Sequence, residues 1–296
     1  MERNILLTIA YDGSRFHGWQ KQPGELTVQG HLEQTLSRLF DREILLSGTS
    51  RTDAGVHALG QRASFRTDVN IPIERLARVC NNALCGREEG SFALSPVRIL
   101  EAKEMPADFH ARFDSRGKKY IYRILPGGIT DIFRRNYVYH VRETLDTEAM
   151  QAAAQMLVGT HDFKSFESAG GNPRQTTVRT IFDAQVIRPG SERDAADASG
   201  QTGALTAGSD AGTGRLLRED ELAIAVSGDG FLYNMVRIIT GTLVEIGQGR
   251  RAPEEMKSII EAAERQAAGH TAPPYGLYLA EVYYGEKGET PDGLKA

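Results

Sequence analysis

Cysteine is scarce in this chain, since only Cys80 and Cys85 occur among its 296 residues. Both lie in a segment that the sequence pattern predicts to be helical. We expect them to pack as small apolar groups, without a disulfide or a metal. No apolar run approaches the ~20 residues of a membrane-spanning helix, and the N-terminal segment lacks the features of a secretory signal peptide. We therefore predict a cytoplasmic protein that does not associate with membranes.

Motifs for metal, phosphate and nucleophilic-serine chemistry are also missing. The seven histidines are scattered, and neither a Cys-x-x-Cys pair nor a His-Glu-x-x-His run occurs. No Walker sequence or dinucleotide-binding glycine fingerprint is present, and no serine has nucleophile-elbow spacing. Asp53 and His57 are four residues apart and could share a helical face, but no third metal ligand is near them in the sequence. We predict that the protein needs no metal and no cofactor.

The composition is that of a globular protein, with 40% apolar and 25% charged residues. A formal net charge of -4 argues against a nucleic-acid partner only on average, because binding depends on local patches. Seven Lys and Arg stand against two Asp between residues 110 and 135, whereas residues 190–214 carry four acids and one Arg. Much of the acidity therefore lies apart from the basic segment.

Periodicity and turn residues predict two successive units of similar element order. Helices are expected over residues 27–40, 72–84, 145–159, 231–247 and 253–264. Strands are expected over residues 4–11, 43–50, 60–67, 91–106, 118–125, 178–188, 221–230 and 276–285. The predicted fold class is α+β, with two similar halves, each a mostly antiparallel sheet backed by helices, and a central active-site cleft.

The predicted domain boundaries follow from this order. The N-terminal α+β half covers residues 1–110, the C-terminal half covers 111–285, and 286–296 form a flexible tail. Residues 190–214 contain no aromatic residue and one Leu, so they bury too little apolar surface to offset their ordering entropy. We expect this acidic segment to be a disordered insertion between two strands.

The apolar segment 231–247 contains a conspicuous cation. Arg237 is the only charged residue between Phe231 and Val244, and a helix that is apolar nearly all round is buried. A buried guanidinium needs a carboxylate, because breaking a buried pair costs on the order of 3–5 kcal/mol. A structural ion pair, an Arg at the helix edge and a functional partner for Asp53 all stay open. We expect Arg134, by contrast, to be a cation whose replacement by Met strands no buried carboxylate.

Two further stretches permit an RNA site without requiring one. GTSRTDAGVHALGQ, residues 48–61, places Asp53 among small residues that allow close approach of a ligand, although such residues also favour ordinary turns. HARFDSRGKKYIYRI supplies cations for phosphate and aromatic faces for a base. Tyr120 and Tyr122 share one face of the strand predicted there, where they would equally suit a sheet core.

Several segments, in this order, resemble the signatures of the bacterial tRNA pseudouridine synthase A family. They are SRTDAGVHALGQ, FHARFDSRGKKYIYRI, LVGTHDFKSF, RTI, FLYNMVRIITGTLVEIG and TAPPYGLYL. The similarity runs from YDGSRFHGWQKQ near the N-terminus to LAEVYY near the C-terminus. It implies an isomerase that acts as a homodimer, without a cofactor, and converts uridine to pseudouridine at positions 38, 39 and 40 of the tRNA anticodon stem-loop.

The resemblance also implies roles for individual residues. Asp53 matches the catalytic aspartate, and Arg237 matches the basic residue that pairs with it. Tyr120 matches the tyrosine that stacks on the flipped base and accepts the proton at C5. Arg51 matches an arginine that helps to extrude the base, and Leu277 matches an apolar residue of the pocket.

His57, Lys118 and Lys119 complete the expected substrate-binding set, with the two lysines as phosphate contacts. Two other functions stay open. One is an RNA-binding or chaperone module of the same fold without catalysis, which would not need Asp53. The other is a metal-assisted nucleotide hydrolase that uses Asp53 and His57, which a chelator would inactivate.

Overall fold

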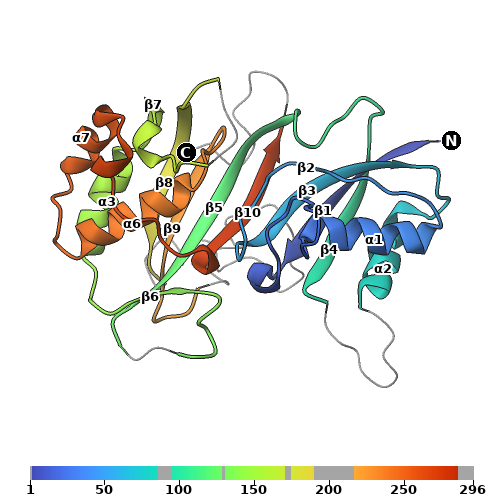
Figure 1. Ribbon diagram of the computed structural model, residues 1–296, viewed down its shortest axis with the longest axis horizontal. Coiled ribbons are helices and arrows are strands. Elements are labelled where there is room, and N and C mark those ends of the chain that lie inside the picture. Colours follow the sequence, from blue (N-terminus) through green and yellow to red (C-terminus); the bar gives the residue numbers. More distant parts are fainter. Residues whose placement is uncertain (1, 86–94, 129–130, 171–174, 190–216, 286–296) are drawn as a thin grey trace, which may run out of the picture. The chain divides into compact units, whose positions relative to one another are not determined.

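A computed structural model describes residues 2–85, 95–128, 131–170, 175–189 and 217–285 of the chain (Figure 1). The chain divides into two compact units. The first comprises Met1–Arg116 and Tyr278–Lys287, and the second comprises Gly117–Leu277 and Gly288–Ala296. The acidic insertion expected at 190–214, the tail expected at 286–296 and the strand residues expected at 91–94 lie outside the described residues.

The described residues of the first unit form a mostly antiparallel sheet with two helices. Its strand order is β4-β1-β3-β10, and β2 pairs with β3. The strands are β1 (Arg3–Tyr11), β2 (Ser47–Gly48), β3 (His57–Thr67), β4 (Val97–Met105) and β10 (Leu277–Tyr284). β1 is antiparallel to β3 and β4, whereas β10 is parallel to β3. The last strand of the chain therefore pairs with an N-terminal strand.

Two helices, α1 (Val28–Phe40) and α2 (Ile73–Leu84), pack against each other in this unit, and α2 also packs on β4 (Figure 1). α1 begins where the sequence predicts, because the Thr27 hydroxyl accepts a hydrogen bond from the backbone N–H of Gly30 at 3.2 Å. Cys80 and Cys85 are free thiols near the end of α2. Burial raises the pKa of Cys80 to about 12, which keeps it an inert thiol.

The strand predicted at residues 43–50 is wrong except for its last part, because only β2 pairs in the sheet. The preceding backbone bonds instead to side chains of α1. The N–H of Leu46 donates to the carboxylate of the buried Glu33 at 3.0 Å, and the N–H of Ile44 donates to the hydroxyl of Ser37 at 2.9 Å. These bonds satisfy the backbone groups that a strand ladder would otherwise use.

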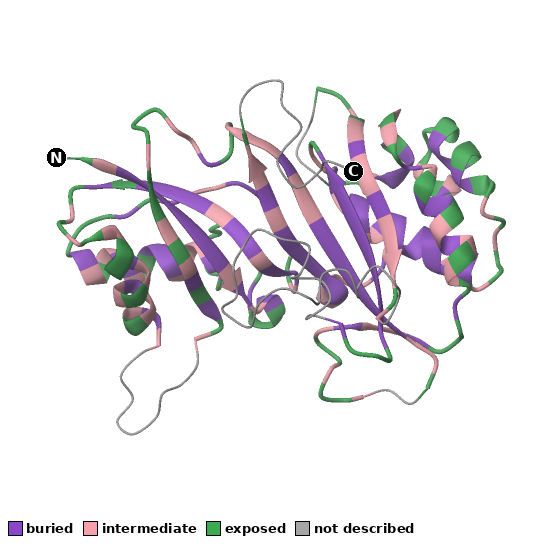
Figure 2. Cartoon of the chain, turned by 180° about the vertical axis from the view of Figure 1, so that it is seen from behind, coloured by how far each residue is buried: buried purple, intermediate pink, exposed green. Residues whose placement is uncertain are grey.

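The second unit has the strand order β5-β9-β8-β7, with β6 beside β5. Its strands are β5 (Ser115–Pro126), β6 (Tyr139–Val141), β7 (Gly159–Asp162), β8 (Val178–Ile187) and β9 (Leu222–Gly228). The pairs are antiparallel except for β5 with β6. Each unit is thus mostly antiparallel, as predicted, and the buried residues of each follow its strands and the inner faces of its helices (Figure 2).

Over the described residues of the second unit, three helices accompany the sheet: α3 (Thr147–Gln155), α6 (Met235–Gly247) and α7 (Glu255–Ala262). α3 packs on β8 and α6, while α7 packs on β7 and α3 (Figure 1). Short 3-10 turns occur at η1 (Gly13–Arg15), η2 (Lys164–Phe166), η3 (Arg265–Ala267) and η4 (Pro274–Gly276). α3 is shorter than predicted, because Gly159 has φ 115° and starts β7 instead of ending the helix.

α6 starts four residues later than the predicted helix at 231–247. Asn234 has φ 61°, in the left-handed region, so the helical ladder begins only at Met235. From there the helix is buried nearly all round, as predicted, with Arg237 and Glu245 as its two half-buried positions. The cation identified in the sequence is therefore held in a well-packed helix.

Arg134 does not behave as the sequence predicted. Its side chain is 13% exposed and pairs with Asp131 at 2.9 Å, Asp220 at 2.6 Å and Glu221 at 2.9 Å. The Glu221 side chain has no exposed surface, and it also pairs with the buried Arg123 at 2.7 Å. Arg134→Met would leave Glu221 its pair with Arg123 but would remove one of the two cations on this buried carboxylate, a contact that the sequence did not predict. Two cations of the basic segment, Arg123 and Arg134, therefore form ion pairs with acidic residues of the same unit.

Arg134→Met is expected to lower the free energy of unfolding by about 2 kcal/mol at pH 7, because it removes charge-assisted hydrogen bonds. The hydrogen bond from Arg134 lowers the pKa of Asp220. The Phe133 N–H and then Arg134 lower the pKa of Asp131. A depressed folded pKa contributes stability above the unfolded value of about 3.9, and that stability is lost as the pH falls through the folded pKa.

Urea unfolding of the wild type and Arg134→Met between pH 7 and pH 2 tests this prediction. The difference between the two proteins should shrink as the pH falls below about 4. A difference that stays constant across this range would show that the acids do not carry the effect.

Candidate active site

The Asp53 loop, residues 49–56, lies between β2 and β3 of the first unit. Its backbone is hydrogen-bonded both before and after Asp53. The carbonyl of Thr52 accepts from the N–H of Trp19 at 3.1 Å, and the N–H of Gly55 donates to the carbonyl of Phe16 at 3.3 Å. The Thr52 hydroxyl is also 2.7 Å from the hydroxyl of Tyr11 on β1. The carboxylate of the half-buried Asp53 is therefore presented by a fixed loop.

Two positions before helix α1 require glycine because the backbone there lies against the backbone of the Asp53 loop. Gly18 has φ 84°, and a Cβ there would lie 2.5 Å from the carbonyl oxygen of Thr52 and 3.2 Å from the carbonyl carbon of Asp53. A Cβ on Gly13 would overlap the carbonyl of Val56. Only glycine lets the 13–19 segment pack this closely on the Asp53 loop.

Gly18→Ala is expected to lower the free energy of unfolding by about 2 kcal/mol and to reduce catalysis, because the added methyl must displace the Asp53 loop. Gly24→Ala is the matched control. Gly24 has φ 77°, which gives the same backbone penalty, but nothing lies within 4 Å of its Cβ position. Thermal melting and turnover should separate the two variants, and equal losses in both would show that close packing on the loop is unimportant.

His57 follows the Asp53 loop as the first residue of β3, so it does not share a helical face with Asp53. Its ring is buried, and Nδ1 accepts from the backbone N–H of Gly13 at 3.1 Å. The same nitrogen is 3.3 Å from a carboxylate oxygen of Asp12. The ring stacks on Tyr278 of β10 at 4.7 Å. These contacts give His57 a role in fixing the start of β3, and its part in substrate binding stays a proposal.

Arg237, on the first turn of α6, donates hydrogen bonds to two neutral groups. Its Nε donates to the carbonyl of Ala272 at 2.7 Å, and Nη1 donates to the Asn234 side-chain oxygen at 2.7 Å. The amide of Asn234 in turn donates to the hydroxyl of Ser168 at 3.1 Å. The sequence did not identify Asn234, although an Asn three residues before a cation in an apolar segment is a signal that can be sought. Its left-handed backbone and its side chain together place the guanidinium.

Tyr120 and Tyr122 are both buried on β5. The ring of Tyr120 meets Phe231 edge to face, with 5.1 Å between the centroids. Tyr122 donates to the carbonyl of Pro273 at 2.6 Å, and burial raises its pKa well above the usual range, against the opposing charge of Arg237. Tyr122 therefore stays neutral and structural, which matches the sheet-core interpretation for this residue.

The remaining predicted site residues are placed as follows. Arg51 is exposed and lies within the Asp53 loop of the first unit, two residues before Asp53. Lys118 and Lys119 are half-buried on β5, opposite Gly228 and Ser227 of β9. The buried Leu277 is the first residue of β10 but belongs to the second unit, and the rest of β10, from Tyr278, belongs to the first.

The predicted residues thus fall into two groups that the structure describes separately. Asp53, Arg51 and His57 belong to the first unit, whereas Tyr120, Arg237, the two lysines and Leu277 belong to the second. Within each unit their side chains are placed by named contacts. That both groups serve one substrate is a proposal.

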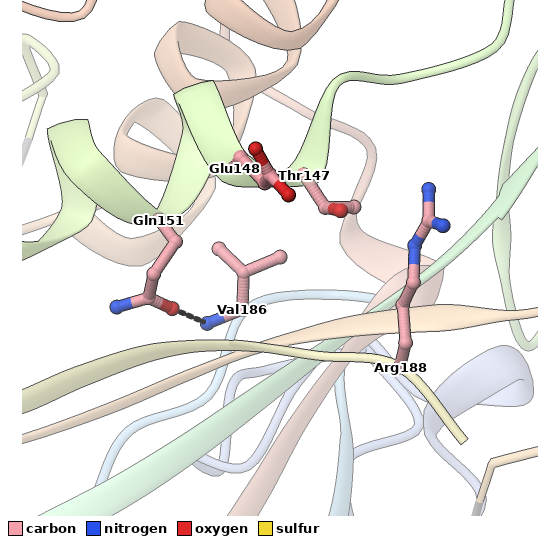
Figure 3. A pocket seen from close by; sticks show the side chains of 5 residues that line it. All are labelled: Thr147, Glu148, Gln151, Val186 and Arg188. Atoms are coloured by element: carbon pink, nitrogen blue, oxygen red, sulfur yellow. Dashed lines mark hydrogen bonds between the residues drawn. The ribbon is translucent and has the colours of Figure 1, made fainter. Parts of the chain in front are cut away.

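A separate pocket of about 390 Å³ occurs in the second unit, beside the start of α3 and the end of β8. It is lined by Thr147, Glu148, Gln151, Val186 and Arg188 (Figure 3). The Gln151 side-chain oxygen accepts from the N–H of Val186 at 2.6 Å, which ties α3 to β8. None of the predicted site residues lines this pocket.

In the part of the chain that the structure describes, no helix combines the length and apolarity that crossing a membrane requires. Over the same residues, no three His, Cys, Asp or Glu side chains gather as they would around a metal ion.

Comparison with known proteins bears on the whole chain. A family model described as tRNA pseudouridine synthase matches residues 7–114 and 153–285. tRNA pseudouridine synthase A 2 of Clostridium tetani is 40% identical over 286 residues, which cover 96% of this chain and 100% of that protein. tRNA pseudouridine synthase A of Halalkalibacterium halodurans is 43% identical over 276 residues, which cover 93% of this chain and 90% of that protein.

A third relative, tRNA pseudouridine synthase A of Acetivibrio thermocellus, is 41% identical over 283 residues, covering 95% of this chain and 100% of that protein. The matched regions include the Asp53 loop, α6 and β10. The resemblance found in the sequence is confirmed. The chain belongs to the tRNA pseudouridine synthase family.

Proposed function

We propose that this chain isomerises uridine to pseudouridine at positions 38, 39 and 40 of the tRNA anticodon stem-loop. The observation that carries the proposal is the Asp53 loop, whose half-buried carboxylate is presented by a backbone that Trp19, Phe16 and Gly18 hold in place. A catalytic carboxylate must be held rigidly to gain from proximity and orientation. This loop lies inside the region that matches the family.

The reaction needs a carboxylate, a cation and a stacking group. A uridine within a stem must first be flipped out, at a cost of a few kcal/mol, and Arg51 assists that step. Asp53 then acts on the extruded nucleotide, and Arg237 keeps its carboxylate ionised. Tyr120 stacks on the base and accepts the C5 proton, while Leu277 packs against the base.

Atoms are conserved in this reaction. The bond between C1′ and N1 breaks, a bond between C1′ and C5 forms, and the C5 proton is lost as N1 gains one. No electrons enter or leave, so the chemistry asks for no redox partner. Exclusion of water protects any glycosyl intermediate from hydrolysis. His57, Lys118 and Lys119 are proposed to contribute to tRNA binding, the lysines through phosphates.

Incubation of the purified chain with an unmodified tRNA transcript tests the proposal. Pseudouridine mapped to positions 38–40 is the expected result, and its formation should persist with a chelator present. Unmodified tRNA after prolonged incubation would contradict the proposal, and loss of turnover on chelation would favour a metal-assisted hydrolase. We further infer a cytoplasmic homodimer from the family resemblance, which sedimentation of the purified chain tests.

A further inference from the structure

The proposed isomerisation does not use an exposed aromatic turn in the first unit. Phe113 lies between β4 and β5, in the turn formed by residues 106–114. Its side chain is 73% exposed, although exposing a phenyl ring to water is unfavourable. A single exposed apolar residue is common on protein surfaces, so the surroundings of the ring must decide whether it has a use.

The turn that carries Phe113 is fixed by side chains. The carboxylate of Asp114 accepts from the N–H of His110 at 2.7 Å. The carbonyl of Ala111 accepts from the hydroxyl of Thr49 at 3.0 Å and from the hydroxyl of Tyr284 at 2.7 Å. The turn is therefore ordered before any partner arrives, which lowers the entropy cost of binding.

A cation and a second ring accompany the phenyl group. The guanidinium carbon of the exposed Arg112 is 5.9 Å from the centroid of the Phe113 ring. The His110 ring centroid is 4.3 Å from that of Phe113. An exposed aromatic face beside an exposed guanidinium is the combination that binds an unpaired base together with its phosphate.

Among the residues that the structure describes, one further aromatic residue, Phe133, is strongly exposed, and no guanidinium lies over its ring. Phe133, in the second unit, is 82% exposed, but its N–H is bonded to the carboxylate of Asp131 at 2.9 Å. Its neighbour Arg134 is engaged by three carboxylates, including Asp220 and Glu221. A phosphate bound beside Phe133 would be repelled by these carboxylates. Phe133 is therefore a matched control of equal chemistry and similar exposure.

We propose that Phe113 stacks on an unpaired base of tRNA other than the target uridine, and that Arg112 holds the phosphate next to that base. The inference rests on the proposed action on tRNA and adds a second contact to it. The contact lies wholly within the first unit, since every group that fixes the turn belongs there.

Binding of unmodified tRNA transcript to Phe113→Ala tests the proposal. The expected result is a dissociation constant about tenfold higher than that of the wild type, recovery in Phe113→Tyr, and no change in Phe133→Ala. The melting temperature of Phe113→Ala should be unchanged, because the ring is exposed. A change below twofold, or an equal loss in Phe133→Ala, would overturn the proposal. So would a shift of Phe113→Ala alone to a smaller sedimenting species, which would identify a second copy of the chain as the partner.

A fluorescence measurement tests stacking without catalysis. The chain has one Trp, Trp19, which is 1% exposed, so Phe113→Trp adds an exposed indole to a buried background. Its emission should be quenched by tRNA, whereas that of Phe133→Trp should not. Equal quenching or no quenching would contradict stacking. A chain that bound tRNA in this way but formed no pseudouridine would refute the proposed function and leave this inference standing.

Discussion

Asp53→Asn is expected to reduce the single-turnover rate of pseudouridine formation by about 10⁴-fold, while folding and tRNA binding are retained. The amide has nearly the shape of the carboxylate, but it is neutral and cannot act as a nucleophile or base. The Asp53 loop is held by backbone bonds to Trp19 and Phe16 and by the hydroxyl contact between Thr52 and Tyr11, and these bonds do not involve the carboxylate of Asp53. Rates measured with excess enzyme over hours, together with tRNA binding, check this prediction.

Asp41→Asn is the control for this experiment. Asp41 is an exposed acid at the end of α1, where its left-handed backbone also suits Asn. It should keep the wild-type rate. An Asp53→Asn variant with near-normal turnover would remove the carboxylate from the mechanism. A variant that has lost tRNA binding as well would show that Asp53 serves the structure of the loop.

Arg237→Met is expected to lower the same rate by about 10²-fold to 10³-fold, because under the proposed function it removes the charge that would keep Asp53 ionised. It also removes donors to Ala272 and Asn234, so part of any loss is structural. Arg237→Lys retains the charge with fewer donors and should recover part of the rate. Melting temperatures of both variants separate the loss of packing from the loss of charge.

Arg250→Met is a suitable control, since Arg250 is 60% exposed and pairs with the half-exposed Glu143 at 3.1 Å. Its replacement should change neither stability nor rate appreciably. Arg134→Met cannot serve, because Arg134 binds the fully buried Glu221. Equally mild effects of Arg237→Met and Arg250→Met would show that Arg237 has no special role.

Local sequence patterns predicted the elements well where side chains face one core. One example is the N-cap at Thr27, and another is α6, an apolar helix that is buried on nearly all of its faces. The predictions failed where a side chain formed hydrogen bonds with backbone groups, or where one residue adopted backbone angles outside the right-handed helical region. At 43–46 the backbone N–H groups bond to the side chains of Glu33 and Ser37 instead of to a neighbouring strand. The left-handed backbone of Asn234 makes α6 begin later than predicted. Such bonds join positions whose contact no periodicity encodes.

Long-range charge pairing was the other limit. Arg134 reads as one more cation in a basic segment, yet two of its partners lie 86 and 87 residues further along the chain. The identities of the proposed catalytic residues came from the family resemblance, because Asp53 alone looks like a loop residue. The support for its loop by Gly18 was not visible in the sequence, since a contact between 13–19 and 52–56 appears only in the fold.

The central claim is that Asp53 and Arg237 act together on the same uridine. A double-mutant cycle of single-turnover rates, with the wild type, Asp53→Asn, Arg237→Met and the double variant, tests it most directly. Residues that act together give strongly non-additive losses. The double variant should therefore be within a few-fold of Asp53→Asn alone. A further loss equal to that of Arg237→Met in the wild-type background would contradict the claim.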